Sequence, residues 1–251
     1  GKDGVVRAMH NVCTHRGTQL TDEQEGKRST FSCRYHMWTF APDGALLSAP
    51  DFERFGLDKK DCALRQVACK VHGGLIFVNF DRNPQQSLRE FLGPLAEGME
   101  KVPCAHATQF SEYVYEIDAN WKLTYDNFQE SYHLRFIHPS TGKATFAPTN
   151  PFGYPAAQEL HDPHRTQTIW TNPDGASLMT PGQLLGFTMG AKAVMRGDVP
   201  ENPENRKYFA VFPSFFMLGS SGNNFSHTVY PIGPEKSRGV IRLYWINDDK
   251  T

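Results

Sequence analysis

The segments "CTHRG" (residues 13–17) and "CRYHMW" (residues 33–38) decide how the first part of this sequence folds. Each pairs one cysteine with one histidine, Cys13 with His15 and Cys33 with His36. A spacer of one or two residues lets neighbouring side chains converge from a tight loop, and the hairpin expected between the segments brings the two loops together. The sequence therefore predicts one metal centre held by four side chains.

Two chemistries suit two cysteines and two histidines. A structural zinc ion takes all four in a tetrahedron, whereas a Rieske [2Fe–2S] cluster takes both cysteines on one iron and both histidines on the other. Zinc fingers usually group like ligands along the chain, and here each loop supplies one of each kind, so the order favours the cluster. The segments resemble the paired cluster-binding loops of Rieske proteins. One departure is Met37, where glycine is usual; we expect its side chain to crowd the backbone and change the hydrogen bonding around the cluster.

A second candidate site lies in "DNFQESYHLRFIHPS", residues 126–140. A helix would place Glu130 and His133 on one face, whereas His138 would lie off that face. The residue before a proline is driven out of the α conformation, so we expect the helix to unwind between residues 134 and 138 and to bring His138 back beside His133. Taken alone, such a pair of histidines is a weak metal motif.

Together with the cluster loops, this stretch resembles the large (alpha) subunit of Rieske non-heme iron oxygenases, the aromatic-ring-hydroxylating dioxygenase family. The resemblance extends over essentially the whole chain, and its second anchor is "NWKLTYDNFQESYHLRFIH" (residues 120–138). It implies that His133 and His138 bind a mononuclear Fe(II) as two members of a 2-His-1-carboxylate triad. It also implies that Glu130, where many members have aspartate, links an iron histidine to a cluster histidine of a neighbouring subunit. The alternative is a solvated acid on a helix face, and we favour the linking role because metal-bound imidazoles usually donate to a carboxylate or another acceptor.

The third iron ligand is not assigned by the sequence. In the family it is an aspartate of a C-terminal segment, and no acid after His138 lies in a segment that resembles it. Asp248 and Asp249 follow an expected strand and look like turn residues. We expect the chain to be a fragment cut at both ends, because it begins on a hairpin-turn signal, Asp3-Gly4, whose first strand would lie upstream. The missing ligand is then expected beyond the C-terminus.

The composition limits the functional classes. The 251 residues are 39% hydrophobic and 21% charged, with a formal net charge of −1. A sizeable core is therefore possible, and no nucleic acid or membrane surface is expected as a partner. Five cysteines without regular spacing do not suit a secreted disulfide framework. We expect a cytoplasmic protein in which Cys62, Cys69 and Cys104 are buried free thiols.

The fold class expected from these patterns is α+β. Residues 1–80 are rich in strand and turn signals and suit a small all-β Rieske domain. Residues 81–251 suit a catalytic domain in which helices cover an antiparallel sheet, in a helix-grip-like arrangement.

Several elements of the second domain are predicted individually. Residues 85–101 have helical spacing interrupted at Gly93-Pro94, residues 110–119 alternate as a strand, and residues 139–208 suggest long loops with short helices. Three strands then follow at the C-terminal end. The segment from residue 120 predicts one helix with a single apolar face, formed by Trp121, Tyr125, Phe128 and Tyr132.

The resemblance implies an oxygenase. Electrons from NAD(P)H would arrive through a separate reductase, sometimes with a ferredoxin, and pass through the cluster to an Fe(II) that activates O₂. The products would be dihydroxylated, monohydroxylated or dealkylated small molecules, as in aromatic compound catabolism. The family forms rings of three subunits, as homotrimers or α3β3 assemblies, in which cluster and iron of different subunits cooperate.

Aromatic acids, polycyclic hydrocarbons and methylated amines all remain possible substrates. Two other functions stay open at this point. One is a Rieske electron carrier without oxygenase activity, which would need only residues 1–80. The other is a binding module stabilised by zinc.

Overall fold

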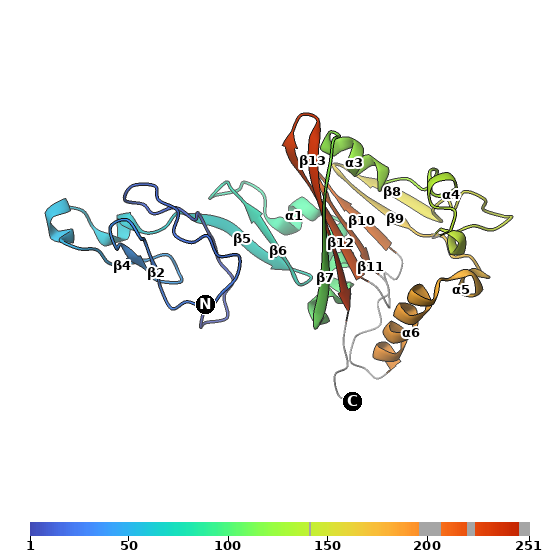
Figure 1. Cartoon of the computed structure of the whole chain (residues 1–251), viewed down its shortest axis with the longest axis horizontal. Coiled ribbons are helices and arrows are strands. Elements are labelled where there is room, and N and C mark those ends of the chain that lie inside the picture. The colour runs from blue at the N-terminus through green and yellow to red at the C-terminus, as the bar shows by residue number, and fades with distance from the viewer. Residues whose placement is uncertain (141, 196–206, 220–223, 246–251) are drawn as a thin grey trace. The chain divides into compact units, whose positions relative to one another are not determined.

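The computed structural model describes residues 1–140, 142–195, 207–219 and 224–245 (Figure 1). The chain divides into two compact units, an N-terminal unit (Gly1–Val71 and Ile76–Leu88) and a C-terminal unit (His72–Leu75 and Arg89–Thr251). The division at residue 80 that the sequence predicts stays a prediction. Among the described residues, no helix combines the length and apolar character needed to cross a membrane.

The N-terminal unit consists of two small antiparallel sheets, in the orders β1-β5-β6 and β2-β3-β4. The strands are β1 (Ala8–Met9), β2 (Phe31–Ser32), β3 (Thr39–Phe40), β4 (Leu46–Ser48), β5 (Gln66–His72) and β6 (Leu75–Asn79). Two short 3-10 helices, η1 (Phe52–Phe55) and η2 (Lys59–Cys62), join the sheets. Because the strands are short, the core depends on side chains from loops, and its buried members are Cys13, Leu20, Cys33, Trp38, Phe40, Leu46, Cys62 and Leu64.

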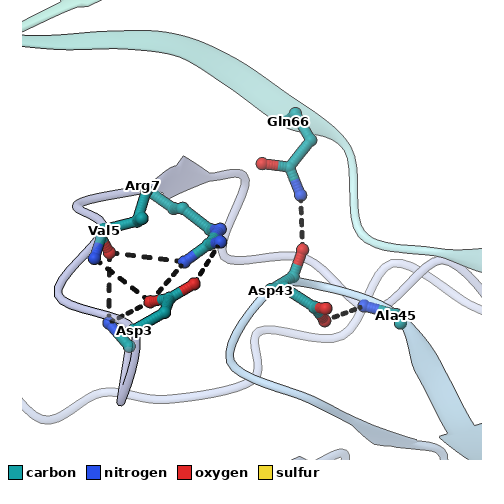
Figure 2. A network of polar contacts seen from close by, with 7 residues as sticks. Asp3, Val5, Arg7, Asp43, Ala45 and Gln66 are labelled. Atoms are coloured by element: carbon teal, nitrogen blue, oxygen red, sulfur yellow. Dashed lines mark hydrogen bonds and ion pairs between the residues drawn. The ribbon is translucent and has the colours of Figure 1, made fainter.

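The first residues form a closed polar turn (Figure 2). The Asp3 carboxylate accepts hydrogen bonds from the backbone N–H of Val5 and from the Arg7 guanidinium, with distances of 3.1 and 2.6 Å. Strand β1, which follows, pairs with β5. The partner strand that the sequence predicts upstream of Asp3 stays a prediction.

The C-terminal unit is built on a seven-stranded antiparallel sheet in the order β7-β13-β12-β11-β10-β9-β8 (Figure 1). Its strands are β7 (Gln109–Ile117), β8 (Ala157–His161), β9 (His164–Thr168), β10 (Lys207–Val211), β11 (Phe215–Gly219), β12 (Asn224–Gly233) and β13 (Lys236–Trp245). The α-helices are α1 (Leu88–Leu92), α2 (Leu95–Lys101), α3 (Trp121–Asn127), α4 (Leu134–Ile137), α5 (Gly175–Leu178) and α6 (Pro181–Met195), and the 3-10 helices are η3 (Pro103–His106) and η4 (Lys143–Thr145). The α+β class and the break between α1 and α2 are confirmed.

Helix α3 lies on one face of this sheet. The Asn120 side chain accepts a hydrogen bond from the backbone N–H of Lys122 and so caps its first turn. Tyr125 stacks on Phe216 of β11 with ring centroids 4.5 Å apart, and Phe128 lies 5.8 Å from the same ring. The opposite face of β7 and β13 carries ion pairs instead, such as Arg238 with Glu116. That face is exposed to solvent at β7 and β13 but buried at β10 and β11, because Phe209 of β10 and Met217 of β11, which point to the same side, are 1% and 0% exposed.

Two predictions about helices are wrong. The helix from residue 120 ends at Asn127, and Tyr132 is 56% exposed and does not share the apolar face. Glu130 explains the end, because its side chain accepts from the backbone N–H groups of Tyr132 and His133, which a continuous helix would use for itself. Residues 139–208 also contain the β8–β9 hairpin and the 15-residue helix α6. The loop prediction rested partly on the prolines of this segment. Pro181, however, is the first residue of α6, a position where helices accept proline.

On the helix-covered face, Tyr115 of β7 lies across strand β13 and reaches β12. Its hydroxyl lies 2.9 Å from Nε2 of His227, which is fully buried. Strand β13 has Gly239 opposite Tyr115, and a Cβ atom at Gly239 would come within 2.2 Å of the tyrosine ring. Glycine at this position is therefore a requirement of the Tyr115–His227 contact.

We predict that Gly239→Ala destabilises the C-terminal unit by about 1–3 kcal/mol, because the added methyl group forces the Tyr115 ring off the sheet. Urea unfolding followed by near-UV circular dichroism measures the change. Gly233→Ala is the matched control, since nothing lies within 4 Å of its Cβ position. Equal stabilities of the two variants would contradict the packing described for Tyr115.

A second prediction concerns acid stability. Burial lowers the pKa of His227 from 6.5 to about 4. Between these values the unfolded chain binds a proton that the folded chain does not, so stability falls as the pH is lowered through this window, by roughly 3 kcal/mol in total. His227→Gln keeps a partner for Tyr115 but does not titrate, and its unfolding free energy should depend less on pH. An equal pH dependence in both proteins would contradict the burial of a neutral imidazole.

Candidate metal centres

The two predicted cluster loops have the same backbone turn. In the first, the N–H of Cys13 donates to Thr18 O at 2.8 Å, and the N–H of Gly17 donates to Cys13 O at 3.0 Å. In the second, the N–H of Cys33 donates to Trp38 O at 2.8 Å, and the N–H of Met37 donates to Cys33 O at 2.9 Å. Each cysteine therefore opens a turn that closes four residues later.

These turns bring the four predicted ligands together. Cys13 and Cys33 are each only 2% exposed, and the rings of His15 and His36 lie with centroids 4.6 Å apart. The His15 ring stacks on Trp38 at 4.8 Å, and its buried Nδ1 atom has no hydrogen-bond partner among the described residues. A buried imidazole nitrogen without a partner suits a metal ligand, because leaving it unsatisfied is costly.

The surroundings of the cysteines also suit metal binding. Burial raises the pKa of the Cys33 thiol, but hydrogen bonds from the backbone N–H groups of Tyr35 and His36 outweigh it, so the pKa lies below its ordinary value. The pKa of Cys13 is raised, chiefly by burial and further by the neighbouring Cys33 thiol. Ionisation of one thiol therefore disfavours ionisation of the other. A cation bound by both sulfur atoms would stabilise both as thiolates. The donor set therefore fits a cluster with two cysteine and two histidine ligands.

Met37 occupies the position that Gly17 holds in the first loop. Its φ is 58°, in the left-handed region, as is the φ of 72° at Gly17. Its side chain is 57% exposed. The expected crowding is therefore absent, and the usual preference for glycine here is explained by backbone conformation.

The second candidate site is formed after α3 ends. The Glu130 carboxylate contacts Nδ1 of His133, and its other oxygen accepts from the His133 backbone N–H at 3.2 Å. Burial raises the pKa of Glu130, but these hydrogen bonds outweigh it and the pKa lies below its ordinary value. An imidazole that donates from Nδ1 to a carboxylate presents Nε2 to a metal. Glu130 is thus in contact with His133, although through a turn and not along a helix.

His138 lies beside His133, with ring centroids 5.5 Å apart. Its φ and ψ of −118° and 49° are outside the α region, as Pro139 predicts. The predicted place of the unwinding is wrong, because α4 runs continuously over Leu134–Ile137 and the chain unwinds before His133. A one-turn helix thus separates the two histidines and places both rings at its ends.

Among the described residues, no carboxylate completes an iron triad with His133 and His138. No group of three or more His, Cys, Asp or Glu side chains that could hold one ion occurs in the part of the chain that the structure describes. A Rieske cluster needs only two protein ligands on each iron, so the absence of a three-residue group among the described residues does not contradict the cluster. It concerns the mononuclear site, which needs three ligands on one iron. Asp248 and Asp249, and the further acids Asp198, Glu201 and Glu204, lie outside the described residues.

Among the described residues, none of the remaining cysteines belongs to a group that could hold a metal ion. All five cysteines are free of disulfides, and Cys62 and Cys104 are buried as predicted, whereas Cys69 is only half-buried. Burial raises the pKa of Cys104 to about 12.

Sequence reasoning missed a contact at the second site, where Arg165 and Gln167 of β9 both bind Gln129. No local pattern reveals it, because the partners lie 36 and 38 residues apart.

Comparison with known protein families gives two matches that together cover most of the chain. Residues 105–250 match the family described as ring hydroxylating alpha subunit (catalytic domain). Residues 1–58 match the Rieske [2Fe–2S] domain. The second match contradicts the zinc alternative for the cluster loops, and the first disfavours a pure electron carrier.

Individual relatives agree with these families. The chain is 37% identical over 139 residues to the oxygenase subunit of glycine betaine monooxygenase from Pseudomonas aeruginosa, covering 55% of this chain and 32% of that protein. It is 26% identical over 257 residues to the oxygenase subunit of carnitine monooxygenase from Acinetobacter pittii, covering 100% and 62%. The chain therefore spans about one third to two thirds of the length of these relatives.

Solved structures show the same fold. A quaternary ammonium Rieske monooxygenase in complex with an inhibitor aligns with a TM-score of 0.75 at 22% identity, covering 100% of this chain and 62% of the other. Naphthalene 1,2-dioxygenase with bound indole aligns with a TM-score of 0.69 at 26% identity, covering 99% and 60%. The predicted arrangement of a Rieske domain followed by a helix-covered antiparallel sheet is confirmed.

We predict that Met37→Gly stabilises the N-terminal unit by about 1 kcal/mol, because glycine adopts a left-handed φ without steric cost. Thermal unfolding of the holoprotein, followed by visible absorption, measures the gain. Tyr35→Gly is the matched control, an exposed residue of the same loop without a positive φ. It should lose stability, and equal behaviour of both variants would contradict the strain assigned to Met37.

Proposed function

Because the chain belongs to the ring hydroxylating alpha subunit family, we propose that the protein is the alpha subunit of a Rieske-type oxygenase that uses O₂ to hydroxylate or dealkylate a small organic molecule. The observation that carries the proposal is that one chain holds both the paired Cys-His loops and the Glu130–His133–His138 group. An electron carrier has no use for the second group.

The proposed ligands are those that the loops bring together. Cys13 and Cys33 would hold one iron of the cluster, and His15 and His36 the other. A Rieske cluster supplies single electrons, and a mononuclear Fe(II) with open coordination positions supplies O₂ activation. The protein's own contribution at the cluster is to keep the thiols buried and to fix the His15 ring against Trp38.

At the mononuclear site, His133 and His138 would be the iron ligands, and Glu130 would hold the proton on Nδ1 of His133. That contact fixes the tautomer and the orientation of the ring. Glu130 is 44% exposed on its side chain, so one side of the carboxylate is accessible to a further donor. We propose that this donor is a cluster histidine of a neighbouring subunit in a ring of three.

The proposed substrate class is small methylated ammonium compounds. The relatives named above act on glycine betaine and carnitine, and the stretch that carries the two histidines also supplies Tyr132 and Phe136 to an aromatic cluster with Phe152. Tyr132 stacks with Phe152 at 5.2 Å, and the Arg135 guanidinium already lies over the Phe152 ring at 5.4 Å. Aromatic faces attract cations of this kind. Aromatic acids and hydrocarbons are the competing classes.

The proposed electron source is NAD(P)H, through a separate reductase and in some systems a ferredoxin. One structural relative is described as showing inter-subunit electron transfer, which supports the expectation that neighbouring subunits cooperate. The beta subunit of an α3β3 assembly stays a further possibility within this proposal.

The ligand assignment is tested by metal content and spectroscopy of the full-length protein. We expect about three iron atoms per chain, two of them in a cluster with Rieske absorption. Cys13→Ser should abolish the cluster spectrum, whereas Cys62→Ser, at another buried cysteine of the same core, should keep it. His133→Ala should keep the spectrum and lose about one iron. A colourless protein carrying zinc would contradict the proposal.

The activity is tested with oxygen-18 gas, NADH and a reductase. Betaines, choline and carnitine should acquire label in a product or in released formaldehyde, ahead of benzoates and naphthalene. A fully loaded protein that labels no substrate of either kind would favour the electron-carrier function instead.

A further inference from the structure

One residue between α3 and α4 is held to the sheet by two side chains. Gln129 follows the end of α3, and its side-chain oxygen accepts a hydrogen bond from the Arg165 guanidinium of β9. Its backbone carbonyl accepts from the side-chain amide of Gln167, also of β9, at 2.7 Å. Arg165 and Gln167 are two apart on the strand, so both point to the same face of the sheet. Together they form a clamp on a single residue.

The clamp lies just beyond the C-terminal end of α3. The last carbonyl groups of a helix lack partners within the helix, and cations are favourable near that end. Gln167 supplies such a partner just beyond α3, and Arg165 supplies the cation. Arg165 is half-buried, and burial lowers its pKa despite the opposing effects of Tyr125 and Asp126. Removing a guanidinium from water is costly, and Arg165 bears this cost. Arg238, which pairs with Glu116, does not, because its side chain is exposed.

The clamp acts on the proposed iron site through one short chain of contacts. Gln129 is joined directly to Glu130, and the Glu130 carboxylate contacts Nδ1 of His133. Helix α3 has ended by this point and no helical hydrogen bond fixes Glu130. The Glu130 carboxylate is bound within its own turn by the N–H groups of Tyr132 and His133, and the contacts at Gln129 fix where this turn lies on the sheet.

We infer that Arg165 and Gln167 are positioning residues that set the Glu130–His133 contact and thereby the geometry and retention of the mononuclear iron. The inference rests on the proposed function, in which His133 is an iron ligand. It assigns the clamp no contact with substrate or iron. Its effect is to keep the His133 ring oriented by the carboxylate of Glu130, whose preceding residue, Gln129, is fixed to the sheet.

The test uses the full-length protein with Arg165→Ala, Arg165→Lys and Gln129→Met. We measure the rate at which a chelator removes the mononuclear iron, and the electron paramagnetic resonance spectrum of its nitric oxide adduct. Arg165→Ala and Gln129→Met should release iron about 10–100-fold faster, the usual effect of losing an outer partner of a metal ligand, and should alter the rhombicity of the adduct. Arg165→Lys keeps a cationic donor and should restore most of the retention.

Controls separate this effect from general destabilisation. The Rieske spectrum should be unchanged in every variant, and Arg238→Ala, which removes an arginine from the other face of the sheet, should match the wild type. Wild-type release rates and adduct spectra in Arg165→Ala would overturn the inference. If Arg165→Ala does not fold, Gln129→Met decides by the same two measurements. A wild-type protein that binds no mononuclear iron would overturn the proposed function instead.

Discussion

The stacking of Tyr125 on Phe216 is the contact on which the second half of this molecule depends. It fixes a helix of only two turns on a sheet face, and such a short helix has little stability of its own. Once α3 is placed, the following turn begins where Arg165 and Gln167 of β9 bind Gln129. The two histidines are separated by one further turn of helix. Burial of aromatic surface thus determines where polar, chemically active side chains emerge.

The N-terminal unit is stabilised in a different way. Its strands are too short to form a large core, and its buried cluster draws on loop residues such as Cys13 and Cys33. A metal cluster joining both loops would therefore serve folding as well as electron transfer, because metal-binding free energy adds to folding free energy when no site exists in the unfolded chain. The stacking of His15 on Trp38 shows the same double use, since one ring is both ligand candidate and packing surface.

Much of this architecture could be read from the sequence, and the successes share a cause. The Cys-His loops, the break at Gly93-Pro94 and the departure of His138 from helical geometry are all decided by neighbours along the chain. The errors arise where side chains compete with the helix for backbone hydrogen bonds, or where distant strands supply a contact, because a sequence pattern shows neither. The helix after residue 120 stops because the Glu130 side chain takes two backbone donors. The clamp on Gln129, from a strand more than 30 residues away, requires the sheet to exist first. Substrate choice depends on surfaces assembled in the same long-range way.

The shared turn of the two cluster loops has a consequence for metal selectivity. The turn is closed by backbone hydrogen bonds from the cysteine and from the residue four positions later, so it does not depend on which intervening residue is the second ligand. The histidine stands two positions after the cysteine in one loop and three positions after it in the other. Ligand identity and loop architecture are therefore separable. A scaffold of this kind lets evolution, or an engineer, exchange donor atoms and shift redox potential while the polypeptide keeps its path.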